Sequence, residues 1–200
     1  MSDSRKIDHT FKFILTGDGQ VGKSQFLSVL CEEKFNNNIQ PTIGVEFMHN
    51  IMNINGNRIK VTLWDTSGKD KFRTLTSSYY RGAQVVGIMY DINSDESITN
   101  ICKWMKEAVN YSTENPIIYI IGNKSDVNYS VHNPSIDKIT LYAHKHNCKH
   151  MVISNKNPEQ VQNVFYEMCQ NIMDNIVPVV PVVKKTNSFL TIFKKSNPTK

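Results

Sequence analysis

The sequence predicts an α/β domain with a mostly parallel six-stranded sheet, one antiparallel edge strand and helices on both faces. Short apolar runs alternate with stretches of helical periodicity across residues 10–176, which is the pattern of such a domain. The runs 84–91 and 117–122 are almost continuously apolar, as is typical of strands buried on both faces. Asn55-Gly56-Asn57 is a hairpin-turn signal and predicts that the two runs flanking it pair in antiparallel fashion.

The elements follow one another in a regular order. Strands are expected at 11–17, 45–53, 58–64, 84–91, 117–122 and 150–154. Helices are expected at 22–30, 70–80, 95–112, 134–146 and 158–175. The last helix has the clearest periodicity, because its apolar residues recur every three or four positions and mark one buried face: Val161, Val164, Phe165, Met168 and Ile172. Pro178 and Pro181 end it, since proline cannot continue a helix.

Length and charge favour one domain with two appendages. Two hundred residues, 40% of them apolar, suffice for one compact core, so we expect an N-terminal extension over 1–9, a domain over 10–176 and a flexible basic and apolar tail over 177–200. The net charge of +5 comes entirely from five lysines in that tail. A basic patch on the body is therefore not expected, nor is nucleic acid as a partner. Four scattered cysteines and the lack of an apolar leader favour a reduced, intracellular protein.

A glycine-rich segment follows the first strand and precedes the first helix. It matches the GxxxxGK[ST] pattern and consists of Gly17, Asp18, Gly19, Gln20, Val21, Gly22, Lys23 and Ser24, with Gln25 next to it. Such a loop wraps its backbone N–H groups around phosphate oxygens, and a helix N-terminus adds positive potential. We expect Lys23 to reach the outer phosphates and the Ser24 hydroxyl to bind Mg²⁺. Glycine-rich turns also form for steric reasons alone, but the strand–loop–helix setting favours the phosphate interpretation.

Two further segments supply candidate metal and phosphate contacts. Asp65-Thr66-Ser67-Gly68 follows the strand 58–64, and Asp65 is placed to hold Mg²⁺ while the Gly68 N–H meets a terminal phosphate. In Pro41-Thr42-Ile43-Gly44, the Thr42 hydroxyl is a candidate second Mg²⁺ ligand and phosphate sensor. The predicted metal set is therefore Ser24, Thr42 and Asp65.

The later strands are followed by candidate base-binding residues. Asn123-Lys124-Ser125-Asp126 follows the strand 117–122, and a carboxylate at Asp126 accepts two hydrogen bonds from the N1–H and N2–H₂ edge of guanine. Adenine presents no such pair of donors, so this contact selects GTP over ATP. Ser154 is expected to orient that carboxylate and the Asn155 N–H to bind the guanine O6, with Lys156 completing the motif. Phe35 is expected against the base, and Pro41 beside the nucleotide.

These motifs occur in a fixed order, each at the carboxyl end of a strand, where open α/β sheets bind ligands. The chain resembles the Ras-like small GTPases over residues 10–176, and IGVEF (43–47), WDTSGKDKFR (64–73) and YYRGA (79–83) narrow the resemblance to the Rab family. The resemblance implies a P-loop G domain that binds GTP or GDP with Mg²⁺, hydrolyses GTP, and acts as a molecular switch in vesicle and membrane trafficking.

The same resemblance implies partners. An exchange factor and a Rab-type activating protein are expected, and the protein is expected to be a monomer. In the family a buried aromatic trio links the switch segments to the core, and it falls here on Phe47, Trp64 and Tyr79. We expect effectors to contact the switch surface made of Ile43, Val45, Phe47, Trp64, Phe72 and Tyr79.

One catalytic position departs from the family pattern. Lys69 stands where Rab proteins usually have the glutamine that positions the attacking water; Gly68 and Thr42 complete the catalytic set. An ammonium has three donors and no acceptor, so Lys69 cannot accept a hydrogen bond from that water. Slow intrinsic hydrolysis is expected. Alternatively, Lys69 points to solvent and an activating partner supplies the missing group.

Two other functions fit parts of the sequence. A GTP-locked scaffold that sequesters effectors without cycling is favoured by Lys69. A P-loop kinase or ATPase is disfavoured by the Asn123–Asp126 motif and by the lack of lid-like arginines. The tail carries no prenylation cysteine, the last cysteine being Cys169, so we expect a cytoplasmic protein whose contact with intracellular membranes is peripheral, weak or mediated by a partner.

Overall fold

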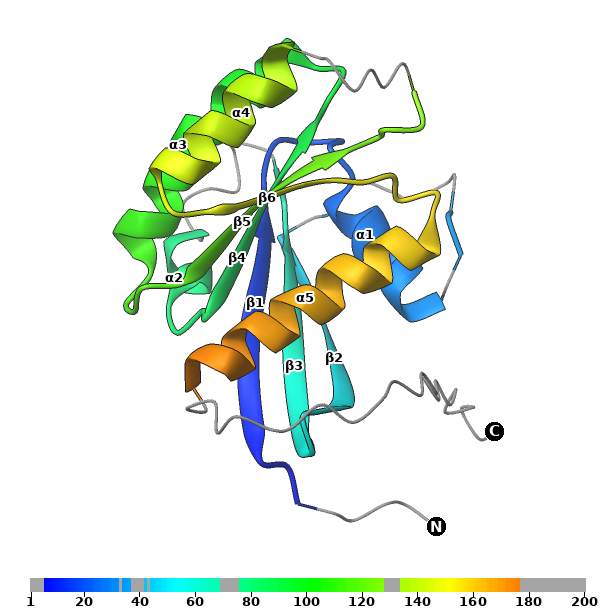
Figure 1. Ribbon diagram of the computed structural model, residues 1–200, viewed down its shortest axis with the longest axis vertical. Coiled ribbons are helices and arrows are strands. Elements are labelled where there is room, and N and C mark those ends of the chain that lie inside the picture. The colour runs from blue at the N-terminus through cyan, green and yellow to red at the C-terminus, as the bar shows by residue number, and fades with distance from the viewer. Residues whose placement is uncertain are drawn as a thin grey trace, which may run out of the picture.

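The computed structural model describes residues 6–32, 34–36, 42, 44–68, 76–127 and 134–176. They form a six-stranded sheet in the order β2-β3-β1-β4-β5-β6 (Figure 1). The strands are β1 (His9–Thr16), β2 (Val45–Ile54), β3 (Asn57–Thr66), β4 (Val85–Asp91), β5 (Ile117–Asn123) and β6 (Lys149–Val152). The helices are α1 (Lys23–Glu32), α2 (Thr76–Tyr80), α3 (Asp95–Tyr111), α4 (Pro134–Lys145) and α5 (Pro158–Ile176).

The pairing confirms the predicted fold class. β2 runs antiparallel to β3, while every other neighbouring pair is parallel. α1 and α5 cover one face of the sheet, and α2, α3 and α4 cover the other (Figure 1). Among the described residues, none of the helices combines the length and apolar character that crossing a membrane requires.

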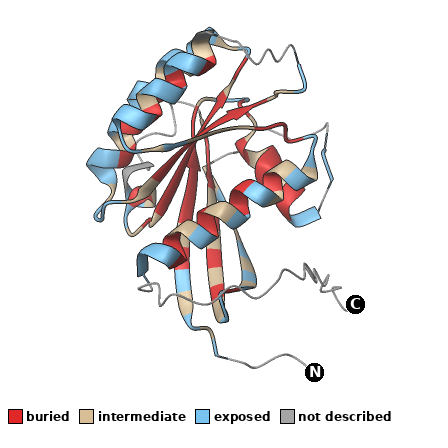
Figure 2. Ribbon diagram, viewed as in Figure 1, coloured by how far each residue is buried: buried red, intermediate tan, exposed pale blue. Residues whose placement is uncertain are grey.

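Alternating side chains of the buried strands build two separate cores. On β1, Phe13 and Leu15 pack on the side of α1 and α5, whereas Ile14 packs on the side of α3 and α4. The central strands are buried along most of their length (Figure 2). The two-sided burial explains why β4 and β5 read as continuous apolar runs in the sequence.

Several element bounds differ from the sequence prediction. Asp65 and Asn123 lie within the last residues of β3 and β5 rather than after them, and Ser154 lies two residues beyond the end of β6. Because a strand end is fixed by its neighbours, these side chains are placed by the sheet itself. Of the helix expected over 70–80, the structure describes only α2, and residues 69–75 lie outside the described part.

The strand order places the glycine-rich loop at the middle of one sheet edge. β1 lies between β3 and β4, so the chain leaves β1 where the order of the strands reverses. The loop after β1 therefore has the end of β3 on one side and the ends of β5 and β6 on the other. All the predicted motifs of the described residues meet at this edge.

Candidate functional site

The glycine-rich loop is drawn tightly around a buried lysine. Lys23 is only 5% exposed, and its ammonium donates to the carbonyl oxygens of Gly17 (2.9 Å) and Asp18 (2.7 Å). Burial lowers the pKa of Lys23 to about 8, and the charges of Asp65 and Asp18 oppose this shift. Gly17 has a φ of +136°, and a Cβ there would lie 2.1 Å from the carbonyl oxygen of Met89. The loop thus presents a cation that an anionic ligand would stabilise.

Asp18 contributes its backbone to the loop and its side chain to a different contact. Its carboxylate accepts hydrogen bonds from Asn100 Nδ2 and from Trp104 Nε1, each at 2.8 Å. Both donors belong to α3, and Trp104 is buried. The Asp18 side chain therefore anchors the loop to α3, a role that the motif alone did not indicate.

A cluster of two hydroxyls and a carboxylate lies beside Lys23. Ser24 Oγ donates to Asp65 Oδ2, Thr42 Oγ1 donates to the same oxygen at 3.1 Å, and the two hydroxyl oxygens are 2.6 Å apart. Asp65 is fully buried, and burial raises its pKa against the opposing effects of Ser24 and Lys23. Its second oxygen, Oδ1, has no hydrogen-bond partner among the described residues. Three clustered oxygen-bearing side chains, one of them with a carboxylate oxygen that lacks a hydrogen-bond partner, form a set of ligands that suits Mg²⁺.

The other end of the site holds an ionised carboxylate. Asp126 accepts a hydrogen bond from Ser154 Oγ at 2.6 Å and pairs with the Lys156 ammonium at 2.7 Å. Hydrogen bonds from Lys156 and Ser154 lower the pKa of Asp126. A carboxylate has about four acceptor positions, so it can still accept from a ligand. Phe35 is nearby, with the Lys156 ammonium 5.9 Å from its ring centroid.

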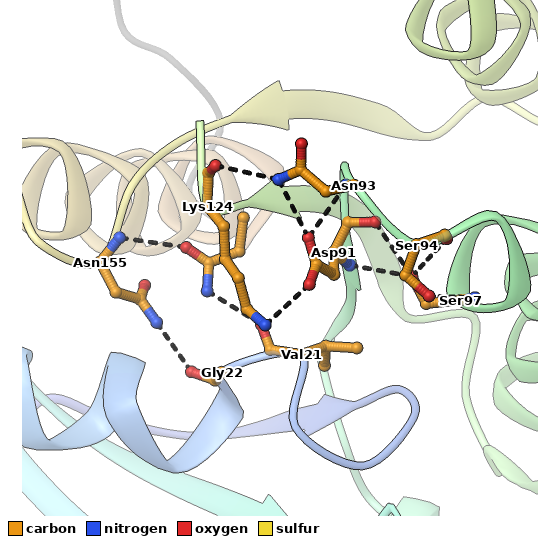
Figure 3. Close-up of polar contacts among 9 residues, drawn as sticks. Val21, Gly22, Asp91, Asn93, Ser94, Ser97, Lys124 and Asn155 are labelled. Atoms are coloured by element: carbon orange, nitrogen blue, oxygen red, sulfur yellow. Dashed lines mark hydrogen bonds and ion pairs between the residues drawn. The ribbon is translucent and has the colours of Figure 1, made fainter. Parts of the chain in front are cut away.

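Lys124 lies at the mouth of the site and is held by its neighbours (Figure 3). Its ammonium pairs with Asp91 Oδ2 at 2.7 Å, and its carbonyl oxygen accepts from Asn93 Nδ2 at 3.3 Å. The side chain of Asp91 also accepts a hydrogen bond from the backbone N–H of Asn93, and the backbone N–H of Asp91 donates to Ser97 Oγ. Lys124 is thereby fixed to the end of β4 and to the loop that follows it.

Two buried asparagines join the base end of the site to the glycine-rich loop. Asn123 Nδ2 donates to the carbonyl oxygen of Val21 at 2.8 Å, and Asn123 Oδ1 accepts from the backbone N–H of Asn155 at 3.0 Å. Asn155 Nδ2 donates to the carbonyl oxygen of Gly22 at 2.8 Å. A Cβ on Gly22 would lie 2.2 Å from Asn123 Nδ2, so only glycine fits there.

These parts enclose a cavity of about 440 Å³, within the range of small-molecule sites. Fifteen of the predicted nucleotide-binding residues line it: Gly19, Gln20, Gly22, Lys23, Ser24, Gln25, Phe35, Thr42, Gly68, Asn123, Lys124, Asp126, Ser154, Asn155 and Lys156. The cavity extends from the phosphate end at Lys23 and Gly68 to the base end at Asp126, so a nucleotide can contact both.

Some predicted residues occupy other positions. Asp18 and Val21 line an adjoining cavity, Asp65 lines a third cavity together with Ser24 and Thr42, and Gly17 supports the loop from beneath. Pro41 and Lys69 lie outside the described residues. Sequence reasoning missed four lining residues: Asn36, Thr66, Ser67 and Val127. Thr66 and Ser67 belong to the Asp65–Gly68 motif, so their place in the site could have been predicted from the sequence. Asn36 and Val127 belong to no motif that would have identified them.

The expected aromatic trio is present but is not buried. Phe47 stacks on Trp64 with ring centroids 5.6 Å apart, and Trp64 lies 6.1 Å from Tyr79. Phe47 is 65% exposed, which corrects the prediction of a buried trio. The reason is that β2 is an edge strand, so its side chains have a neighbouring strand on one side only. The Lys12 ammonium lies 4.3 Å from the Trp64 ring centroid. Ile43 and Phe72 of the expected effector surface lie outside the described residues.

Comparisons with known proteins agree with this architecture. The model of the Ras family matches residues 12–174. The chain is 36% identical to the Ras-related protein Rab-1D of Dictyostelium discoideum, over 90% of this chain and 87% of that protein. It is 33% identical to the Ras-related protein SEC4 of Saccharomyces cerevisiae, over 87% and 80%, and 35% identical to the Ras-related protein Rab11D of Lotus japonicus, over 82% and 75%. The chain therefore belongs to the Ras family, in its Rab branch: it is a small GTPase that binds GTP or GDP together with Mg²⁺.

Proposed function

We propose that this protein is a Rab-like molecular switch that acts in vesicle and membrane trafficking and hydrolyses GTP slowly on its own. The observation that carries the proposal is the meeting of Thr42 with Ser24 and Asp65. Three separate segments of the chain converge there, beside the lysine of the glycine-rich loop. Such a junction is suited to sensing a terminal phosphate, because a phosphate bound there would add contacts to the segments, and these contacts are lost when it leaves.

Each end of the cavity has an assigned role in this proposal. Ser24, Thr42 and Asp65 would hold Mg²⁺, which when bound would neutralise phosphate charge. Lys23 and the backbone of residues 17–25 hold the phosphates, with Gly68 and Thr42 at the terminal one. Gly68 suits close approach, because a Cβ there would lie 2.4 Å from the Asp18 carbonyl carbon.

The base end selects guanine through Asp126. Its ionised carboxylate faces the N1–H and N2–H₂ donors, and Ser154 and Lys156 hold it in place. The Asn155 N–H binds the guanine O6, and Phe35 and Lys124 lie against the base. Calorimetry tests this assignment: the purified protein should bind GDP and GTP with measurable heat, and ATP should not compete. Equal competition by ATP would refute guanine selection.

Slow intrinsic hydrolysis follows from Lys69, which lies outside the described residues. An ammonium contacting the terminal phosphate stabilises the bound ground state as well as the transition state, and equal stabilisation gives no gain in rate. It also cannot orient the attacking water, because an ammonium accepts no hydrogen bond from it.

We expect Lys69→Gln to accelerate single-turnover GTP hydrolysis by about 10- to 100-fold, the range that correct positioning of one reactant supplies. The measurement is the rate of phosphate release from preloaded protein without an activating partner. Lys69→Met is the matched control, because it keeps the length of the side chain and provides neither the charge nor the amide. Identical rates for the Lys69→Gln and native proteins would exclude the idea.

A non-cycling scaffold is the second candidate, and Lys69 is the feature that favours it. Such a protein would remain GTP-bound and sequester effectors instead of releasing them. The nucleotide that co-purifies with the protein discriminates the two functions: mainly GDP supports cycling, and mainly GTP supports the scaffold.

Partners are proposed to bind at the switch surface. Phe47, Trp64 and Tyr79 form a continuous aromatic contact whose outer member is 65% exposed, and exposed aromatics of this kind dominate many interfaces. We propose that effectors bury Phe47 together with Val45, and that an exchange factor and a Rab-type activating protein act on the same monomer. Contact with intracellular membranes is proposed to be peripheral, through a partner or the basic tail.

A further inference from the structure

We propose that the Asn155 side chain is a positioning residue that couples the base end of the nucleotide site to the phosphate loop and slows nucleotide release. The inference rests on the proposed function of the site. It concerns the amide group of Asn155, whereas guanine recognition uses the backbone N–H of the same residue.

The amide reaches the loop from a segment far along the sequence. Asn155 Nδ2 donates to the carbonyl oxygen of Gly22 at 2.8 Å, and the two residues are 133 positions apart (Figure 3). Asn155 is only 2% exposed. A hydrogen bond this well shielded from water competes little with solvent, so its loss has a measurable effect.

The acceptor, Gly22, is the residue immediately before α1. The carbonyl oxygen of Gly22 also accepts the first hydrogen bond of that helix, from the N–H of Phe26 at 2.9 Å. A carbonyl oxygen has two lone pairs, so both bonds can form together. The oxygen is thus held by Asn155 and by the helix, and the peptide that carries it cannot rotate without breaking both bonds.

Fixing this oxygen also fixes the direction of an amide hydrogen. A trans peptide is planar, so its carbonyl oxygen and its N–H point in opposite directions. With the Gly22 oxygen held toward Asn155, the N–H of Lys23 is directed to the opposite side of the loop. In the same way Asn123 holds the Val21 oxygen at 2.8 Å and directs the N–H of Gly22. Two successive N–H groups of the phosphate loop are therefore oriented by two asparagines.

The close approach of these amides supports the assignment. A Cβ on Gly22 would lie 2.2 Å from Asn123 Nδ2 and 2.9 Å from Asn155 Nδ2, so both amides lie directly against the Gly22 backbone. The Asn155 N–H also donates to Asn123 Oδ1 at 3.0 Å, which joins the asparagines to each other. Movement at the base end is consequently transmitted to the phosphate loop.

The hydrogen-bonding capacity of the Asn155 amide is only partly used. Its Oδ1 atom is buried and has no hydrogen-bond partner in the part of the chain that the structure describes. A buried acceptor without a partner disfavours folding. An alanine would avoid this cost, so the benefit of the amide is expected in ligand binding rather than in stability.

Asn155→Ala tests the proposal, because it removes the side-chain bond and keeps the backbone N–H. Release of a fluorescent GDP analogue, displaced by excess GDP in the presence of Mg²⁺, should become about three- to tenfold faster, the factor that corresponds to one lost hydrogen bond. Asn175→Ala is the matched control: its Nδ2 also donates to a carbonyl oxygen, that of Asn171 at 2.7 Å, but at the end of α5. It should leave the release rate unchanged.

A second measurement separates positioning from simple support of the base end. GMP lacks the outer phosphates, so its dissociation constant should change less than twofold in Asn155→Ala while that of GDP rises with the release rate. An unchanged GDP release rate overturns the proposal, as does an equal weakening of GDP and GMP. Failure of the native protein to bind any guanine nucleotide would instead overturn the proposed function itself.

Discussion

Asp126 shows how a single carboxylate is prepared for recognition by its neighbours. Ser154 and Lys156 each contact one of its oxygens, at 2.6 Å and 2.7 Å. Both contacts favour the charged form and lower its pKa, so the group remains an acceptor throughout the neutral range. An acceptor-only group discriminates between bases by which donors they present.

Replacing Asp126 with asparagine is expected to exchange the preferred base. The amide has one acceptor and one donor, so it no longer matches the two donors of guanine, but it matches xanthine, which has an N1–H donor and an O2 acceptor. We expect GDP affinity to fall by at least about 100-fold, because polar groups that are mismatched once the bound base covers them are costly. Binding of XDP should improve.

The measurement is competition between GDP and XDP for the same protein. Asp137→Asn, which changes an exposed carboxylate on α4, serves as the control and should not alter the preference. An unchanged ratio of GDP to XDP affinity in Asp126→Asn would show that this carboxylate does not contact the base.

At the scale of single elements, one histidine of β6 connects that strand to β4 and to α4. His150 lies between Tyr90 of β4 and Thr140 of α4, with hydrogen-bond distances of 2.9 Å on both ring nitrogens. Thr140 Oγ1 donates to the carbonyl oxygen of Ile136, so it accepts from His150 Nδ1. Nε2 is then the acceptor for the Tyr90 hydroxyl, and the ring is neutral.

This contact predicts a loss of stability at mildly acidic pH. Burial lowers the pKa of His150 to about 4 from an ordinary value of 6.5. Between these values the unfolded chain binds a proton that the folded chain does not, so stability is complete above about pH 6.5 and decreases as the pH falls toward 4. We expect the free energy of unfolding to decrease by about 1–2 kcal/mol over this pH range, a value already reduced for the partial exposure of the ring.

Urea unfolding at several pH values measures this dependence, with nucleotide and Mg²⁺ saturating at each pH. A His150→Gln variant should be less stable at neutral pH but show a shallower decline between pH 6.5 and 4. His144, an exposed residue of α4, provides the control substitution His144→Gln. Parallel pH profiles for the native and His150→Gln proteins would rule out His150 as the source of the loss of stability at acidic pH.

The sequence predicted elements well and the contacts between them poorly. Apolar periodicity and the turn at Gly56 located all six strands, and the motifs located Lys23 and Asp126. The contact of Asp18 with Trp104 joins residues 86 positions apart. Nothing in local composition indicates such a pair, because it depends on how α3 packs against the end of β1. The exposure of Phe47 was missed although the edge position of its strand was predicted, because the burial of the trio was inferred from the family resemblance.

At the scale of the whole molecule, the site exists only when the sheet is complete. Its parts come from the ends of β1, β3, β5 and β6 and from the start of α1, and no two of the main motifs are adjacent in sequence. Binding energy is therefore linked to global folding: a nucleotide that contacts both ends of the cavity stabilises the native state alone.

GDP with Mg²⁺ is accordingly expected to raise the temperature of unfolding. At a free concentration of about 1,000 times its dissociation constant, a ligand that binds only the folded state adds about 4 kcal/mol. For a domain of this size that corresponds to roughly 10 °C. Thermal unfolding of the GDP-loaded protein should show this shift relative to the protein treated with EDTA, which would remove the Mg²⁺ that Ser24, Thr42 and Asp65 are proposed to hold. ADP is the matched ligand control and should give no shift, because it lacks the donor pair that Asp126 accepts. Equal shifts with ADP and GDP would mean that the folded state is stabilised through the phosphates alone.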